Sequence, residues 1–197
     1  FQAGAGVSTG VQNTLLGGLA GDALTVGNKN IAIGYRSLSA DTKGNKNVAV
    51  GNFALSTQNF TTATDVFNVA VGHGAGEGIT TGIKNTLIGG LAGDALTDAD
   101  MNIVVGAEAL AIDTLGSASV AIGRSALETQ NFTTATTTEN VAVGNQAGLS
   151  NLTGTAATFI GHYSGRFATT ADSTTFVGAN AGRGITGTKL TGNNNTA

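Results

Sequence analysis

The chain has no cysteine, no proline and no tryptophan, and only 11% of its 197 residues are charged. Without cysteine it forms no disulfide and offers no thiolate to a metal. Cysteine usage therefore does not indicate whether the protein works in an oxidising or a reducing compartment. The net charge of −3 gives no basic footprint for nucleic acid or an anionic membrane. No apolar run approaches the roughly 18 residues that span a bilayer. We therefore expect no nucleic-acid partner and no membrane insertion.

Glycine and short apolar segments are abundant instead. Glycine accounts for 31 of the 197 residues, and 41% of the chain is apolar with a mean hydropathy of +0.15. Low charge with this hydropathy favours burial over disorder. The most regular feature is the pattern NVAVG at residues 47–51. It returns as NTLLG at 13, NIAIG at 30, NVAVG at 68, NTLIG at 85, NIVVG at 102 and NVAVG at 140, with looser copies SVAIG at 119, ATFIG at 157 and TTFVG at 174.

The glycine that ends each copy, here called the anchor glycine, sets the period. The ten anchors are Gly17, Gly34, Gly51, Gly72, Gly89, Gly106, Gly123, Gly144, Gly161 and Gly178. Successive anchors differ in residue number by 17, 17, 21, 17, 17, 17, 21, 17 and 17, so the pattern as a whole returns at a shift of 72. A period of about 20 residues is typical of a solenoid. Each repeat is called a rung below.

The columns of the repeat predict short strands and no helix. The residue before each anchor is a branched aliphatic, and the residue three before it is β-branched, as in Val50 and Val48. β-Branched residues suit strands, and two glycine-rich turns per rung leave no room for helices. The sequence therefore predicts an all-β solenoid, a single array over residues 1–197 in ten rungs whose lengths follow the anchor spacings. Both ends fall inside repeats, so we expect a piece of a longer chain.

The strand is apolar on both faces, which predicts an assembly. Between these two columns lies a third, here called the middle column. Because successive side chains of a strand point to opposite faces of the sheet, the middle column faces away from the other two. Its members are Leu15, Ala32, Ala49, Ala70, Leu87, Val104, Ala121, Ala142, Phe159 and Phe176. A sheet that is apolar on both sides is buried on both. We expect Val48 and Val50 to face the interior of the coil, and Ala49 to face other copies of the chain.

Two features of the rung have alternative interpretations. The asparagine that opens most copies either stacks its amide on the asparagine of the next rung or simply tolerates a turn. The four extra residues of each long rung belong to the segment QNFTTAT, at 58–64 and 130–136. This segment predicts a protruding lateral loop. Phe60 and Phe132 either pack back on the rod or contact a ligand, and packing back is favoured because exposed phenylalanines invite association.

With these columns the sequence resembles the repeat regions of phage tail fibres, which carry N-T-A-[VI]-G-x-x-A-L units about every seventeen residues. It is also similar to the heads of trimeric autotransporter adhesins of the YadA type, whose shorter repeats have an S-V-A-I-G core. The resemblance covers the whole chain. It implies a homotrimer of left-handed parallel β-rolls on a virion or cell surface. In such phage fibres a self-cleaving chaperone domain often follows, which would lie beyond Ala197.

Candidate chemistry is sparse. GGLAGDALT at residues 17–25 and 89–97 approaches a calcium-binding nonapeptide, but calcium sites of that kind need tandem copies. These copies lie four rungs apart, so Asp22 and Asp94 are interpreted as solvated turn residues. His73 and His162 each follow an anchor glycine without a second ligand at metal spacing. No carboxylate pair or nucleophile–base pair can be argued. We expect no enzyme, no metal and no cofactor.

The sequence thus favours a structural function. The first hypothesis is a shaft segment of a trimeric phage tail fibre or appendage, located on the virion and bound to other virion or fibre proteins, which supports host attachment. The alternative is a trimeric adhesin on a bacterial surface that binds a host or matrix receptor. In either case the lateral loops are candidate contacts for a cell-surface glycan or protein receptor.

Overall fold

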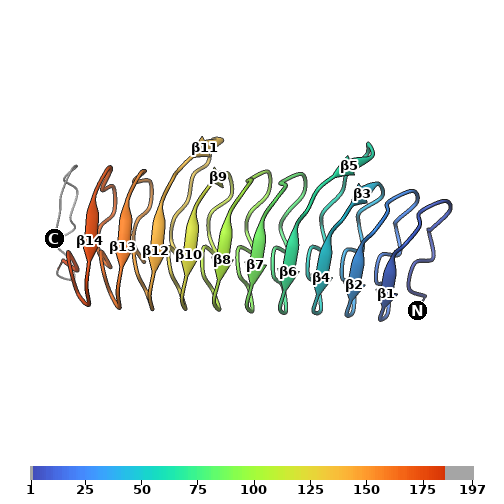
Figure 1. Cartoon of the computed structure of the whole chain (residues 1–197), viewed down its shortest axis with the longest axis horizontal. Coiled ribbons are helices and arrows are strands. Elements are labelled where there is room, and N and C mark those ends of the chain that lie inside the picture. The colour runs from blue at the N-terminus through green and yellow to red at the C-terminus, as the bar shows by residue number, and fades with distance from the viewer. Residues whose placement is uncertain (1, 185–197) are drawn as a thin grey trace.

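In the computed structural model, which describes residues 2–184, the chain is a β-solenoid of parallel strands without a helix in that range (Figure 1). Ten strands of three residues form one sheet: β1 (Thr14–Leu16), β2 (Ile31–Ile33), β4 (Val48–Val50), β6 (Val69–Val71), β7 (Thr86–Ile88), β8 (Ile103–Val105), β10 (Val120–Ile122), β12 (Val141–Val143), β13 (Thr158–Ile160) and β14 (Thr175–Val177). Two further pairs of two residues each are β3 (Gly44–Asn45) with β5 (Thr64–Asp65), and β9 (Gly116–Ser117) with β11 (Thr136–Thr137).

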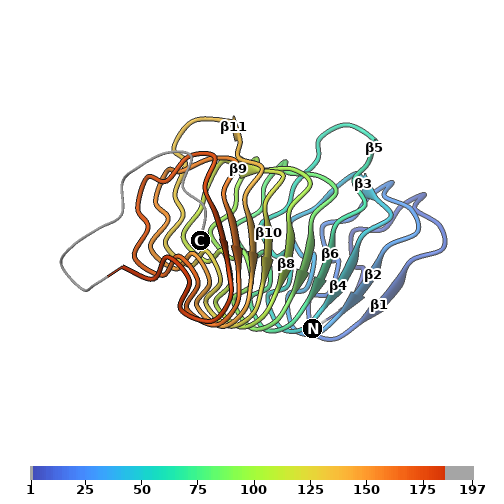
Figure 2. The same ribbon diagram turned by 60° about the vertical axis from the view of Figure 1, so that its left-hand side comes forward.

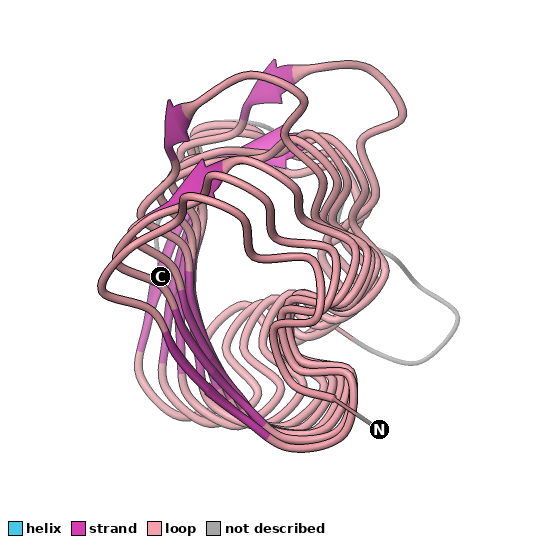
Figure 3. Ribbon diagram, turned by 90° about the vertical axis from the view of Figure 1, so that its right-hand side faces the viewer, coloured by secondary structure: helices cyan, strands magenta, loops and turns pink. Residues whose placement is uncertain are grey.

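The ten-stranded sheet forms one wall of the rod, and turns form the other walls (Figure 3). Each strand pairs in parallel with the strand one rung away, and the columns stay in register. Ala49, for example, pairs with Ala32 on one side and Ala70 on the other. The predicted all-β solenoid, with one strand before each anchor glycine, is confirmed.

The anchor glycines are required by both conformation and space. Gly51 has φ +133°, and a Cβ built on it would lie 2.3 Å from the carbonyl oxygen of Gly72 in the next rung. The chain therefore turns at each anchor with the backbones of successive rungs in contact, which no side chain would allow. A second turn precedes the strand, where a residue such as Lys46 takes φ +63°.

The predicted assignment of strand faces is wrong. Ala49 is fully buried inside the coil, whereas Val48 and Val50 are half-buried on the outside. The same holds along the sheet, where the middle residue of each strand is the least exposed. The interior is too narrow for two branched columns, and it is filled by the single middle column and by side chains from the turns. Because both faces are apolar, hydropathy alone did not mark the inner one.

The middle column varies in size, and in most rungs its size is opposite to that of the residue four positions after the anchor. Ala49 is matched by Leu55 in the same rung, and both are fully buried. Phe159 is matched by Gly165, whose added Cβ would lie 2.2 Å from the Phe159 ring. In these rungs a large residue on one side of the interior is offset by a small one on the other. The match does not extend to every rung, because Ala70 with Gly76 and Ala142 with Gly148 are both small, and Val104 with Leu110 are both large.

The recurring asparagines form a buried hydrogen-bonded ladder. Asn30 is fully buried; its Oδ1 accepts from the backbone N–H of Asn47 at 2.9 Å and from the Asn47 amide at 3.2 Å. Its own Nδ2 donates to the carbonyl of Gly44 at 2.9 Å, in the turn that precedes the strand of the next rung. The left-handed turn conformation belongs to the preceding residue, such as Lys46, and not to the asparagine. The ladder interpretation is therefore confirmed over turn tolerance.

Candidate functional surfaces

The two long rungs carry lateral loops on the same side of the rod, at β5 and β11 (Figures 1 and 2). Their strands pair back onto the preceding rung, β5 on β3 and β11 on β9. The two loops lie four rungs from each other. At about 4.8 Å per rung this places them about 19 Å apart.

A buried carboxylate holds the base of the first loop. Asp41 is fully buried, and its Oδ1 accepts from the backbone N–H groups of Gly44 (3.0 Å) and Phe60 (3.1 Å). Its Oδ2 accepts from the Gln58 amide at 2.6 Å, and Gln58 Oε1 accepts from Asn68 at 2.8 Å. Because the backbone donors and the Gln58 amide satisfy this carboxylate, it can stay inside the rod without an ionic partner.

The second loop has the same support. Asp113 accepts from the N–H groups of Gly116 (3.1 Å) and Phe132 (2.9 Å) and from the Gln130 amide (2.5 Å). Gln130 in turn accepts from Asn140 at 2.9 Å. The repeat pattern alone did not predict these networks. The available signal was that Asp41 and Gln58 both recur at a shift of 72.

Phe60 and Phe132 pack back on the rod, each with 8% of its surface exposed. The tip of each loop consists of the exposed residues 61–63 and 133–135, with the sequence TTA. Near the first loop, Asp65 forms an ion pair with Lys46 at 2.5 Å, and this hydrogen bond lowers the pKa of Asp65 below its ordinary value. The predicted lateral contacts can therefore involve threonine hydroxyls and this ion pair, but not the phenylalanine rings.

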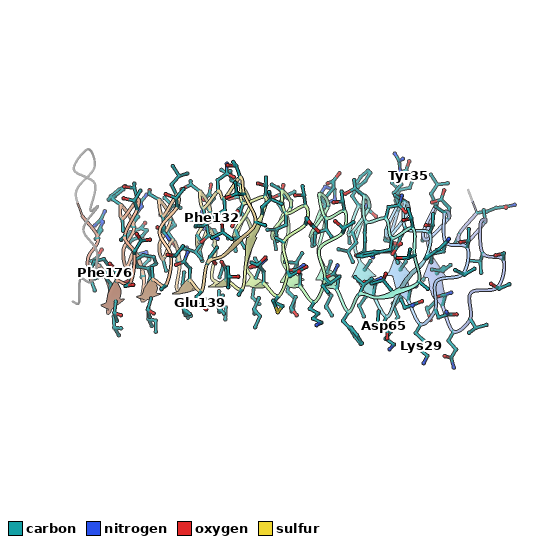
Figure 4. All side chains as sticks on the ribbon, turned by 90° about the horizontal axis from the view of Figure 1, so that it is seen from above. Lys29, Tyr35, Asp65, Phe132, Glu139 and Phe176 are labelled. Atoms are coloured by element: carbon teal, nitrogen blue, oxygen red, sulfur yellow. The ribbon has the colours of Figure 1, made fainter. Side chains whose placement is uncertain are left out.

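The outer face of the ten-stranded sheet is an apolar strip, defined here as the two β-branched columns. It carries no charged residue at its twenty positions, and members such as Leu16 (64%), Ile103 (45%) and Val177 (56%) are well exposed. The column before the asparagines, along one rim, holds three lysines, Lys29, Lys46 and Lys84, and one acidic residue, Glu139. The opposite rim, after the anchors, holds polar and aromatic residues; Lys29 and Tyr35 extend from opposite edges of the rod in Figure 4.

A groove of about 450 Å³ crosses the turns of four rungs, next to the residues that lead into the first lateral loop. Phe53 lies in its lining, between two aromatic neighbours from adjacent rungs. The Phe53 ring is perpendicular to the Tyr35 ring (centroids 5.6 Å apart, 89°) and to the His73 ring (5.9 Å, 87°). Its other lining groups are carboxylates, a guanidinium, hydroxyls and an amide: Asp22, Arg36, Ser39, Ala40, Ser56, Thr57, Asn59 and Glu77.

The candidate metal residues are not brought together. Among residues 2–184 no three histidine or acidic side chains converge at a metal-binding geometry. His73 contacts Phe53, and His162 stacks on Tyr163 with the ring centroids 3.7 Å apart.

Burial raises the pKa of Asp94, and the negative charges of Glu77 and Glu108 add to the shift. No helix in the described range is long and apolar enough to cross a membrane.

Comparison with known proteins adds no assignment: no protein-family model matches this chain, and no curated protein or solved structure matches it significantly.

Proposed function

We propose that this chain is a shaft segment of a trimeric surface fibre, of the phage tail-fibre type, that spaces an attachment tip from its base. The observation that carries the proposal is the uncharged apolar strip, which follows the sheet along all ten strands. An exposed apolar surface of this extent is typical of an interaction site. The occupant we infer is further copies of the same chain.

The dimensions of the strip suit such an assembly. Nine spacings of about 4.8 Å give a length of about 43 Å, and two columns with their side chains are about 15 Å wide. This area of about 650 Å², divided between two neighbours, gives about 325 Å² to each, so the polar rims supply the rest of the roughly 800 Å² per partner of a stable interface. A narrow strip turned toward a shared axis contacts two neighbours at once, which favours three copies, as the resemblance to trimeric fibres also implies.

The backbone suits a mechanical role. Each strand inside the sheet is hydrogen-bonded to the rungs on both sides, as in the bonds from Gly51 N to Ile33 O (2.7 Å) and from Val48 N to Asn68 O (2.9 Å). The buried asparagine ladder adds side-chain bonds in the same direction. Bending the rod would strain many such bonds together, so a stiff spacer is the expected behaviour.

Immunogold electron microscopy tests the location. Antibodies raised against this chain are applied to a bacterial culture that carries its gene, both to released virus particles and to the cells. Label on tail appendages supports the proposal. Label on the surface of uninfected cells supports the adhesin alternative and overturns the phage role, and label on neither overturns both.

A further inference from the structure

The groove at Phe53 has the chemistry of a carbohydrate site, and we infer that it binds a neutral oligosaccharide. The inference deepens the proposed attachment role and rests on it. Phe53 is half-buried and supported by the perpendicular rings of Tyr35 and His73, so its ring is held in one orientation. The negative face of an aromatic ring attracts the weakly positive C–H groups that line one side of a sugar ring.

Polar groups of both kinds lie around that ring. Asp22 and Glu77 supply carboxylate acceptors, and Arg36 supplies guanidinium donors. The Thr57 hydroxyl donates to the carbonyls of Glu77 and Ile79 and keeps a lone pair for a ligand, and Asn59, whose Oδ1 accepts from Thr42, offers its Nδ2 donors. No side-chain hydrogen bond or ion pair joins Asp22, Arg36 or Glu77 to any residue in the described part of the chain. One oxygen of Asp22 is buried without a hydrogen-bond partner there. Sugar hydroxyls both donate and accept, so they match such a mixed set.

The charge of the groove selects against other ligands. Two carboxylates and one guanidinium leave the lining net negative, which repels nucleic acids and acidic polysaccharides. An apolar peptide would leave the charged groups desolvated without partners. A neutral, hydroxyl-rich ligand with one apolar face avoids both the charge repulsion and the desolvation of unpaired charged groups.

The chain contains an internal control for the groove, because the same backbone recurs four rungs later with other side chains. Tyr35, Arg36, Phe53 and His73 correspond to Ala107, Glu108, Ser125 and Asn145. Phe53 and Ser125 share the left-handed backbone conformation, with φ +63° and +56°. The fold therefore requires none of the aromatic residues, and Phe53→Ser introduces a residue that this position of the rung already accommodates.

Saturation-transfer NMR with maltohexaose, cellohexaose, mannohexaose and chitohexaose tests the inference. We expect at least one of these sugars to bind the unaltered chain, and F53S and R36E each to weaken that binding at least tenfold. E128S, which places the residue of the first repeat at the matching position of the second, is the control and leaves binding unchanged.

Binding by none of the four sugars, binding that survives F53S, or capture of members of a random peptide library instead overturns the inference. Mass and melting temperature of F53S are measured in parallel, and both stay as in the unaltered chain. The lining comes from a single copy of the chain. A monomeric mass would therefore refute the trimeric fibre while leaving the sugar result readable.

Discussion

The two four-rung units, residues 13–84 and 85–156, share most of their interior and differ more on the outside. The buried positions that hold the lateral loops are identical: Asp41 and Asp113, Gln58 and Gln130, Asn68 and Asn140, and Phe60 and Phe132. Four positions at the groove, in contrast, differ: Tyr35, Arg36, Phe53 and His73 correspond to Ala107, Glu108, Ser125 and Asn145, whereas Asp22, Thr57 and Asn59 recur as Asp94, Thr129 and Asn131. Structure is therefore encoded by the inward columns, and the outward columns of the turns are free to carry binding.

The largest effect is expected from a charge in the middle column. Ala49→Asp, or Ala121→Asp at the matching position, places an unpaired carboxylate where no solvent reaches, and we expect a loss of about 3–5 kcal/mol in either unit. Urea unfolding measures it. Val50→Thr, a change of similar volume on the outer face, is the control. An A49D chain that unfolds like the unaltered one would show that the middle column is not interior.

The next largest effect comes from the loop supports. Asp41→Ala leaves the N–H groups of Gly44 and Phe60 and the Gln58 amide without their acceptor. At about 1–3 kcal/mol per unsatisfied buried group, partly relieved by water, we expect a loss of about 3 kcal/mol. Asp113→Ala should cost about 1 kcal/mol less than Asp41→Ala, because the Gln130 amide keeps Ser119 Oγ as a second acceptor at 3.0 Å.

Thermal unfolding distinguishes these variants from Asp65→Ala, which removes an exposed ion pair and a long hydrogen bond from Asn45 (3.4 Å) and should change little. A larger loss at Asp113 than at Asp41 would contradict the role of Ser119 as a second acceptor.

One buried pair differs between the units and offers a double-mutant cycle. Ser119 shares a hydrogen bond of 2.6 Å with Thr138 in the second unit, where the first unit has Asn47 and Val66. We expect S119N and T138V each to cost about 1 kcal/mol, because each leaves a mismatched partner, and the double variant to recover most of it. Urea unfolding of all four proteins measures the coupling. Strictly additive losses would contradict a matched exchange.

The smallest effect is electrostatic. Asp94 has a pKa raised above 3.8 by burial and by Glu77 and Glu108, so its contribution to stability is present below pH 3.8 and is lost as the pH rises through its folded pKa. Glu108→Arg restores the charge that the first unit carries at Arg36 and lowers that pKa. We expect a gain of less than about 1 kcal/mol at neutral pH that disappears below pH 3.8. Melting curves between pH 3 and 7 test this; an equal gain at every pH would exclude Asp94 as its source.

The repeat was readable from the sequence because its constraints are steric. Gly51 must lack a side chain, and Val48 and Val50 suit a strand, so period, strand ends and fold class followed from the columns. The inward direction did not follow. When both faces of a strand are apolar, the alternation of side chains defines two faces but does not show which one is enclosed. The structure shows it, because Ala49 and Leu55 of the same rung are both fully buried.

The groove was not predictable for a different reason. Tyr35, Phe53 and His73 occupy two different columns of three successive rungs, and no fixed spacing brings them together. Their contact depends on the turn conformation at each anchor, which the sequence pattern marks only by its glycine. Asp41 was not predicted because an acidic residue in a turn is ordinarily solvated, whereas here the turn encloses it.

We propose that the apolar strip on the outer face holds the copies of the chain together, whereas the middle column stabilises the fold of each copy. Light scattering on the 19.3 kDa chain and on a Val50→Asp, Ile122→Asp variant tests this division most directly. We predict a mass of about 58 kDa, three times 19.3 kDa, for the unaltered chain and 19.3 kDa for the variant, with the β-sheet circular dichroism signal retained. A monomeric unaltered chain, or a variant that keeps the higher mass, would contradict it.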